Sequence, residues 1–271
     1  SGPLLCGLGI RRARLLLGFG LGGCRLGFGR LGVLGCLCVN IGPFCIIGDD
    51  VEIEEGTRVL SHVVIKGPTK IGKNNTIYQF SSIGEDTPDK KFKGEDTKLI
   101  IGDDNIFREG VTVHRGTIQD KGVTKIGSSN LLMAYTHIAH DCLVGDNNIF
   151  ANNAGIAGHV SVGNYVVIGG YSAVHQFCSL GDYSFAGMNT SITMDVPAYI
   201  KVASNPARVI GLNSVGMSRN NIPSESISLI KKAFKIVYKK GLKLEVSLKE
   251  IDVLLSVNND NYLDIFFQSI K

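Results

Sequence analysis

The chain has 271 residues, of which 44% are hydrophobic and 19% are charged, and its formal net charge is +4. This length accommodates one large domain and a smaller one, and 34 glycines beside only seven prolines indicate many tight turns rather than disorder or a collagen-like helix. The composition therefore gives no reason to expect a nucleic-acid-binding protein, and because no run approaches about 20 apolar residues, we expect no stable membrane insertion.

Residues 1–40 form an anomalous N-terminal segment. Residues 1–38 contain five arginines and no acidic residue, so without these five arginines the net charge of +4 becomes −1. An arginine-rich, acid-free stretch is typical of a targeting peptide. We favour another interpretation, in which the first coils of the following domain are present and the written letters are not the true sequence. No functional prediction rests on this segment.

The cysteines indicate a reducing compartment. Four of the seven lie in the anomalous segment. The other three are far apart and show no zinc-ribbon spacing, which predicts reduced thiols, no metal site and a cytoplasmic location. They are Cys45, Cys142 and Cys178.

An aliphatic residue recurs every six positions along most of the remaining chain. The clearest run begins at Ile126 and is apolar at all twelve positions up to Ile192. The fourth residue after each of these is small or medium-sized and is never charged or aromatic, and glycine often follows the aliphatic directly. An earlier run with the same period extends from Ile41 to Ile83. A middle run consists of Ile101, Phe107 and Val113.

This period predicts a left-handed parallel β-helix for residues 41–200. Six residues provide one short strand and one tight turn, and three such units close a triangular coil of eighteen residues. The aliphatic and the small residue point into the coil, and stacked coils bury their core against their neighbours. An amphipathic α-helix has a period of 3.6 residues and cannot produce this repeat.

Two segments interrupt the repeat. Residues 84–100 are charged and rich in lysine, so we expect them to leave the solenoid as a loop. Residues 114–125 shift the phase of the repeat by one position, which predicts a second, shorter loop.

Residues 201–271 are predicted to form a helical domain at the end of the solenoid, because the repeat stops at Val196. Residues 224–240 have the pattern of an amphipathic helix, with Pro223 suited to its start and Gly241 to its end. A second helix is expected to begin at Ser247, where Ser247 and Glu250 match a capping box. Residues 262–270 are apolar enough for a third.

Histidines gather along one edge of the predicted prism. Positions that differ by eighteen lie above one another, which puts His140, Gly158 and Gln176 in one column, with His159 and His175 beside it. This arrangement fits acyl transfer: His140 would take a proton from a hydroxyl nucleophile, Asp141 would orient its imidazole, and the Gly158 N–H would meet the oxyanion.

Two alternatives explain the same histidines. They can form hydrogen bonds across a packed subunit interface, with no chemical role. The pair in the sequence HIAH, at positions i and i+3, can also supply two zinc ligands, with a third from a neighbouring chain.

Several segments together resemble one family, the bacterial UDP-N-acetylglucosamine O-acyltransferases. The resemblance covers residues 41–240. It implies the transfer of a 3-hydroxyacyl group from acyl carrier protein to the 3-hydroxyl of UDP-N-acetylglucosamine, the first step of lipid A biosynthesis, by a homotrimer without a cofactor. The segments are IGPFCIIG (41–48), SHVVIKGPTKIG (61–72), IYQFSSIGE (77–85), VTVHRGT (111–117), HIAHDC (137–142), AGHVSV (157–162) and AVHQFC (173–178).

The resemblance also implies roles for single residues. By similarity, His140 is the general base, Asp141 its partner and Gly158 the oxyanion donor. Asn213 and Arg219 match positions that contact the nucleotide or the carrier protein, although Asn220 stands where the family has a second basic residue. The positions that match substrate contacts are Asp89, Lys91, His114, His137, His159, His175 and Gln176.

Met188 stands where many relatives have glycine at the end of the acyl groove. A bulky side chain there is expected to shorten the groove and to favour a shorter hydroxyacyl chain. Its alternative role is to pack a subunit interface.

Three rival functions share the predicted fold. The first is a related transferase that acylates an amine and carries an additional uridine-binding domain, for which residues 1–38 leave little room. The second is a zinc-dependent hydratase, and the third is a purely structural solenoid.

Overall fold

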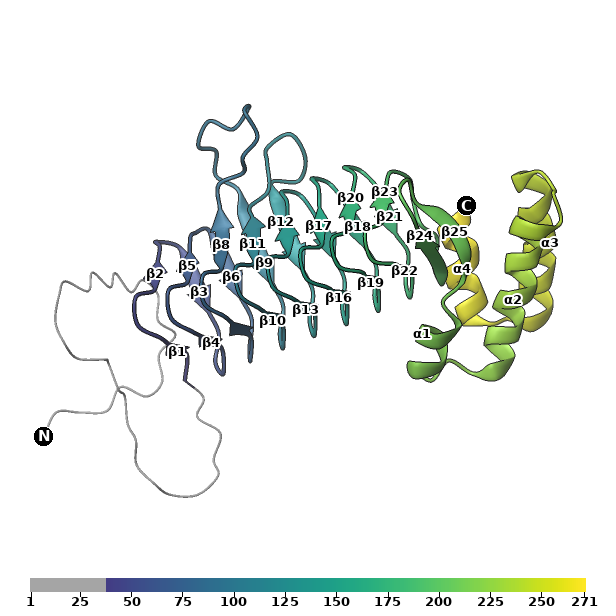
Figure 1. Ribbon diagram of the computed structural model, residues 1–271, viewed down its shortest axis with the longest axis horizontal. Helices are drawn as coiled ribbons and strands as arrows, with labels where there is room; N and C mark the ends of the chain where they lie inside the picture. Colours follow the sequence, from purple (N-terminus) through teal and green to yellow (C-terminus); the bar gives the residue numbers. More distant parts are fainter. Residues whose placement is uncertain (1–37) are drawn as a thin grey trace, which may run out of the picture.

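The computed structural model describes residues 38–271, in which a three-sided prism of short strands is followed by a group of helices (Figure 1). Each coil of the prism adds a strand to each of three sheets, here named A, B and C. Within the described residues, the prism is a left-handed parallel β-helix with helices at its C-terminal end, as the sequence predicts. Residues 1–37 are outside the described residues, so the structure does not test the predictions made for the N-terminal segment.

The three sheets contain the following strands, in spatial order. Sheet A contains β1 (Asn40–Ile41), β4 (Arg58–Val59), β7 (Thr76–Ile77), β10 (Ile106–Phe107), β13 (Leu131–Leu132), β16 (Ile149–Phe150), β19 (Val167–Ile168), β22 (Phe185–Ala186), β24 (Ile200–Ala203) and β25 (Arg208–Leu212). Sheet B contains β2 (Ile46–Ile47), β5 (Val64–Ile65), β8 (Ser82–Glu85), β11 (Thr112–His114), β14 (His137–Ile138), β17 (Gly155–Ile156), β20 (Ala173–Val174) and β23 (Ser191–Ile192). Sheet C contains β3 (Val51–Ile53), β6 (Thr69–Ile71), β9 (Lys98–Ile101), β12 (Val123–Ile126), β15 (Leu143–Val144), β18 (Ser161–Val162) and β21 (Ser179–Leu180).

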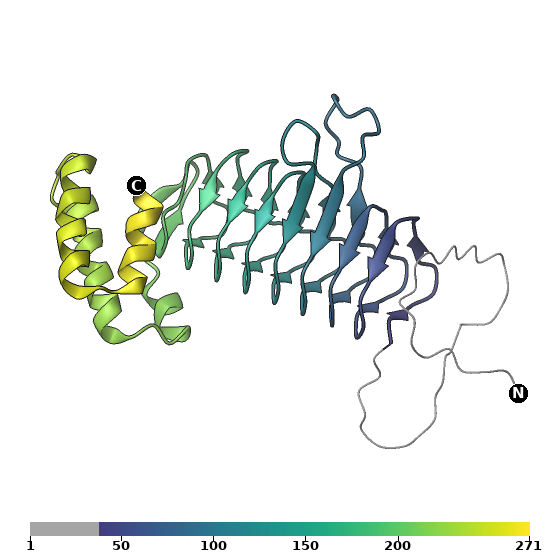
Figure 2. The ribbon, with the colours of Figure 1, turned by 180° about the vertical axis from the view of Figure 1, so that it is seen from behind.

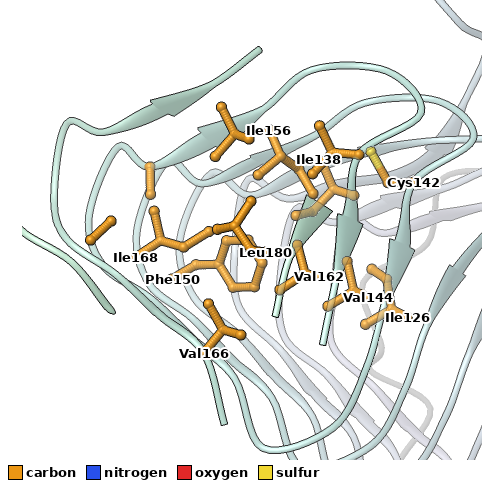
Figure 3. Packing of buried hydrophobic residues seen from close by; sticks show 14 of the residues in the cluster. Ile126, Ile138, Cys142, Val144, Phe150, Ile156, Val162, Val166, Ile168 and Leu180 are labelled. Atoms are coloured by element: carbon orange, nitrogen blue, oxygen red, sulfur yellow. The ribbon is translucent and has the colours of Figure 1, made fainter. Parts of the chain in front are cut away.

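The eighteen-residue coil sets the register of the sheets. In sheet C, Ile126 pairs with Val144 and Val144 with Val162, each time eighteen residues on. The aliphatic positions of the repeat therefore stack inside the prism, where Ile138, Phe150 and their counterparts from Val59 to Ile192 are buried (Figure 3). From Thr57 to Val196 the small residue of each unit is also buried, because its side chain fills the same narrow interior.

Two loops replace tight turns along one edge of the prism. Residues 86–97 connect β8 to β9, and residues 115–122 connect β11 to β12, so both loops run from sheet B to sheet C. Figures 1 and 2 show them side by side, projecting from the same edge.

The end of the prism differs in part from the prediction. The hexad pattern stops at Val196, but sheet A continues, since β24 pairs with β22 in parallel and β25 folds back on β24 in antiparallel orientation. These strands lack the repeat because β25 closes the sheet as a hairpin and does not start another coil.

Four helices follow within the described residues: α1 (Ser214–Arg219), α2 (Ser224–Lys239), α3 (Leu244–Asn258) and α4 (Asn261–Ile270). The limits of α2 agree with the predicted start after Pro223 and end before Gly241. The prediction that a capping box at Ser247 begins the second helix is wrong. Helix α3 begins three residues earlier, and Ser247 is buried inside it with its hydroxyl 3.4 Å from the Ile236 carbonyl oxygen. The position of Ser247 within α3 is therefore explained by its contact with α2.

Among residues 38–271, none of the helices has the length and apolar character needed to cross a bilayer.

Candidate active site

The predicted column forms at the edge between sheets B and C. His140, Gly158 and Gln176 follow β14, β17 and β20, and the register of these strands places each residue one coil above the last. Gly158 lies directly against the imidazole of His140: a Cβ at position 158 would be 2.5 Å from His140 Cε1 and 2.7 Å from Nε2. Only glycine fits this contact without displacing the ring.

His140 forms a hydrogen-bonded pair with Asp141. The distance from His140 Nδ1 to Asp141 Oδ2 is 2.9 Å, and the side chain of Asp141 is fully buried. Its carboxylate accepts hydrogen bonds from the Thr117 N–H at 2.9 and 3.0 Å and from the Thr117 hydroxyl at 2.6 Å. A buried carboxylate with these donors is held in one orientation. Because Asp141 accepts at Nδ1, the proton of neutral His140 is on Nδ1 and Nε2 is left as the basic nitrogen.

His159 lies beside this pair, one coil above. Its ring packs edge-on against His140, with centroids 5.1 Å apart at 88°, and stacks on Phe177 at 4.5 Å and 8°. Its Nδ1 is 3.0 Å from Asp120 Oδ2, on the loop 115–122. Two acid–histidine pairs therefore stand next to each other at this edge.

The two loops and the column enclose a pocket of about 640 Å³. It brings together five of the residues predicted from the sequence, although the loops and the column are far apart along the chain. A second hollow of about 740 Å³, between sheet C and α4, contains no histidine, so the acid–base chemistry belongs to the first. The first is lined by Asp89, Lys91, Thr117, Gln119, Asp120, His140, His159, Gln176 and Phe177.

Four of these residues were not predicted: Thr117, Gln119, Asp120 and Phe177. The first three belong to a loop outside the repeat, where the eighteen-residue spacing gives no position. Phe177 continues the column of Asp141 and His159 at eighteen-residue intervals, so the spacing could have indicated it.

His114 and His137 lie together next to the pocket but do not line it. Their ring centroids are 5.1 Å apart, and His137 Nδ1 is 2.8 Å from the Thr112 hydroxyl. Burial, with a smaller effect from His137, lowers the pKa of His114 to about 4, and burial also lowers the pKa of His137. Both imidazoles are thus neutral near pH 7 and suited to hydrogen bonding rather than to pairing with phosphate.

Four other predicted residues do not line the pocket. His175 is exposed, with Nδ1 3.1 Å from the Gln176 carbonyl oxygen. Met188 is 75% exposed. Asn213 is buried and caps α1, accepting from the Gly216 N–H and donating to the Tyr183 carbonyl oxygen. Arg219 is exposed in the last turn of α1. For these four residues, contact with substrate stays a prediction.

A metal interpretation concerns a cluster different from the predicted HIAH pair. Ligand atoms of His140, Asp141 and His159 lie within 4.8 Å of one another. In this arrangement, however, Asp141 already accepts hydrogen bonds from Thr117 and from His140, and Asp120 occupies Nδ1 of His159. Asp141 is engaged at both oxygens and is not a free ligand. The two carboxylates hold Nδ1 of His140 and of His159 and leave both Nε2 atoms open, an arrangement that suits a general base and that also holds a metal-ligating histidine.

Comparison with known proteins identifies relatives along most of the chain. A family model described as "Udp N-acetylglucosamine O-acyltransferase; Domain 2" matches residues 195–271, and one described as "Bacterial transferase hexapeptide (six repeats)" matches residues 124–158. A protein of Stutzerimonas stutzeri (strain A1501), named acyl-(acyl-carrier-protein)--UDP-N-acetylglucosamine O-acyltransferase, is 55% identical over 213 residues, which cover 79% of this chain and 83% of that protein.

Solved structures agree with this relationship. The structure of LpxA from Acinetobacter baumannii has 48% sequence identity and a TM-score of 0.82, covering 86% of this chain and 90% of that one. The UDP-N-acetylglucosamine O-acyltransferase (LpxA) of Moraxella catarrhalis has 47% identity and a TM-score of 0.83 at the same coverage of both chains. With this identity over most of both proteins, the chain belongs to the UDP-N-acetylglucosamine O-acyltransferase family.

Proposed function

We propose that this protein transfers a 3-hydroxyacyl group from acyl carrier protein to the 3-hydroxyl of UDP-N-acetylglucosamine, the first step of lipid A biosynthesis. The name of the Stutzerimonas stutzeri relative contains both substrates, acyl-(acyl-carrier-protein) and UDP-N-acetylglucosamine. The observation that carries the proposal is the pocket that His140 lines together with two polar loops, with Asp141 hydrogen-bonded to the His140 imidazole and the Gly158 backbone packed against the same ring.

The proposed mechanism uses the chain's own residues throughout. His140 Nε2 takes the proton of the sugar hydroxyl, whose oxygen attacks the thioester carbonyl carbon. The developing oxyanion accepts a hydrogen bond from the Gly158 N–H, which has no partner among the described residues. When the C–S bond breaks, the imidazolium of His140 returns the proton to the departing thiolate. Asp141 stabilises the imidazolium between these two steps.

Substrate contacts are proposed for the residues around this centre. Asp89 and Lys91 line the pocket from the loop 86–97, and Gln176 and His159 line it from the prism. His114, His137 and His175 lie beside these groups, and we propose that they contact the sugar or the acyl chain. Asn213 and Arg219 are proposed to contact the nucleotide or the carrier protein through the α1 region.

The test is an acyl-transfer assay with UDP-N-acetylglucosamine and hydroxyacyl carrier protein. His140→Ala should lower kcat by about 100- to 10,000-fold, the usual contribution of a general base, with an unchanged circular dichroism spectrum. His62→Asn is the matched control, because His62 is exposed at the far end of the prism and asparagine tolerates its left-handed backbone. If His140→Ala kept most of the activity, His140 would not be the base.

We further propose that Met188 limits the length of the acyl chain. Its side chain is exposed in the single chain and is free to close a groove between neighbouring subunits. The protein should use a ten-carbon hydroxyacyl carrier better than a fourteen-carbon one, and Met188→Gly should reverse this order. Equal or better use of the longer chain by the unaltered protein would contradict the proposal.

The protein is proposed to act as a homotrimer in the cytoplasm. A prism exposes flat faces that associate readily, and closed cyclic symmetry is usual in such assemblies. The thiols of Cys45, Cys142 and Cys178 suit a reducing compartment. Sedimentation velocity should give three times the 29.1 kDa mass of one chain, and a monomer would contradict the proposed assembly.

A further inference from the structure

Asp120 connects a loop outside the repeat to the histidine next to the proposed base. It lies on the loop 115–122, 39 positions before His159, and its Oδ2 is 3.0 Å from His159 Nδ1. The side chain of His159 is 15% exposed and that of Asp120 is 37% exposed. The pair therefore lies at the mouth of the pocket, where a substrate can reach it.

Three neighbours fix the ring of His159. Phe177 stacks on its face, His140 lies at its edge, and Asp120 accepts at Nδ1. A carboxylate is an acceptor only, so neutral His159 bears its proton on Nδ1. Its Nε2 then offers a lone pair and can accept a hydrogen bond from a hydroxyl or an amide N–H of a ligand.

The same loop also supports the proposed base. Thr117, three residues before Asp120, donates to the Asp141 carboxylate through its backbone and its hydroxyl. One short loop thus holds Asp141, which orients His140, and holds His159 directly. The two imidazoles lie at 88° to each other, and residues 117 and 120 contact the two carboxylate–histidine pairs that contain them.

We infer that Asp120 is a positioning residue for the nucleotide sugar: it holds His159 with Nε2 available as a hydrogen-bond acceptor beside His140. This inference rests on the proposed acyl-transfer function. It assigns Asp120 no contact with the reacting atoms, so its removal should weaken the binding of the sugar more than it slows the chemical step. Asp120→Asn keeps the shape but provides an amide that can also donate, which allows the other tautomer of His159.

The experiment is a double-mutant cycle with Asp120→Asn and His159→Gln. We expect Asp120→Asn to raise KM for UDP-N-acetylglucosamine at least fivefold while kcat changes less than twofold, and Asp120→Glu to restore KM in part. In the His159→Gln background, Asp120→Asn should have no further effect. Lys121→Gln is the control, since Lys121 is exposed on the same loop and does not line the pocket.

Two outcomes would overturn the inference. One is a KM for Asp120→Asn within twofold of the unaltered protein, and the other is an effect of the same size with and without His159. Asp120→Ala provides a second variant in case asparagine disturbs the loop, with circular dichroism as the check. Failure of the unaltered protein to transfer acyl groups would instead count against the proposed function, so the two failures are distinguishable.

Discussion

At position 158 the backbone and the imidazole of His140 lie so close that a methyl group decides the geometry of the site. Gly158→Ala would place its Cβ 2.5 Å from His140 Cε1 and force the ring to move. A displacement of about 1 Å at a reacting group costs about 100-fold in rate, so we expect kcat to fall by that order. Gly155→Ala is the control, because its Cβ would meet only His137 Cβ at 3.8 Å. Steady-state kinetics that rank the two variants equally would contradict this account.

Inside the prism, buried asparagines continue the hydrogen bonding from coil to coil. Asn105 donates from Nδ2 to Asn75 Oδ1 at 3.0 Å and to the Gly127 carbonyl oxygen at 2.9 Å, and its Oδ1 accepts from the backbone and side chain of Asn130. Asn105→Ala would leave two groups without these partners, the backbone N–H of Asn130 and the carbonyl oxygen of Gly127, and would remove one of two hydrogen bonds from Asn75 Oδ1 and from Asn130 Nδ2. At about 1–3 kcal/mol for each such group, the free energy of unfolding should fall by about 3 kcal/mol or more.

The control for this prediction is Asn152→Ala, at an exposed position in the same prism. It should change the free energy of unfolding by less than about 0.5 kcal/mol. Urea denaturation followed by circular dichroism measures both variants. Similar midpoints for the two would show that the asparagine hydrogen bonds contribute little.

Among the elements, the two loops at the active-site edge share one anchor. Arg115 is 6% exposed, donates to the Gly84 carbonyl oxygen at 2.6 Å and forms an ion pair with Asp86. Its guanidinium thereby ties the start of the loop 115–122 to the start of the loop 86–97. Arg115→Met should destabilise this region by about 2 kcal/mol, because a charged hydrogen bond to a buried carbonyl is lost.

Hydrogen exchange should detect the loss as faster exchange of the amides in residues 86–97 and 115–122. Arg108→Met is the control, since Arg108 pairs with its neighbour Glu109 at the surface, where ion pairs contribute less than about 1 kcal/mol. If exchange in both loops were unchanged in Arg115→Met, this anchor would not control them.

The elements also show what could be predicted from sequence. The repeat predicts the strands and the column of His140, Gly158 and Gln176, because the eighteen-residue coil converts sequence spacing into position. The paths of the loops follow no period, so the contacts of Thr117 and Asp120 with the column could not be predicted. The false capping box at Ser247 has a similar cause: local sequence preference was weaker than packing between α2 and α3.

Considered as a whole, the solenoid is stabilised by contacts between neighbouring coils, so a half-buried group in a central coil contributes to the stability of the prism. His114, on β11, is such a group. Burial lowers its pKa from 6.5 to about 4, and the nearby His137 shifts in the same direction. Between these two pH values the unfolded chain binds a proton that the folded chain does not. Folding stability should therefore be greatest above pH 6.5 and decline as the pH falls toward 4.

For His114 this contribution is on the order of 2 kcal/mol after allowance for its partial exposure. Urea denaturation at several pH values between 7 and 4.5 measures it, and His114→Gln removes it. The stability of the unaltered protein should fall more steeply with acid than that of His114→Gln, and the difference should develop below pH 6.5. If the free energy of unfolding of the two proteins fell in parallel as the pH was lowered, protonation of His114 would not be a cause of the loss of stability in acid.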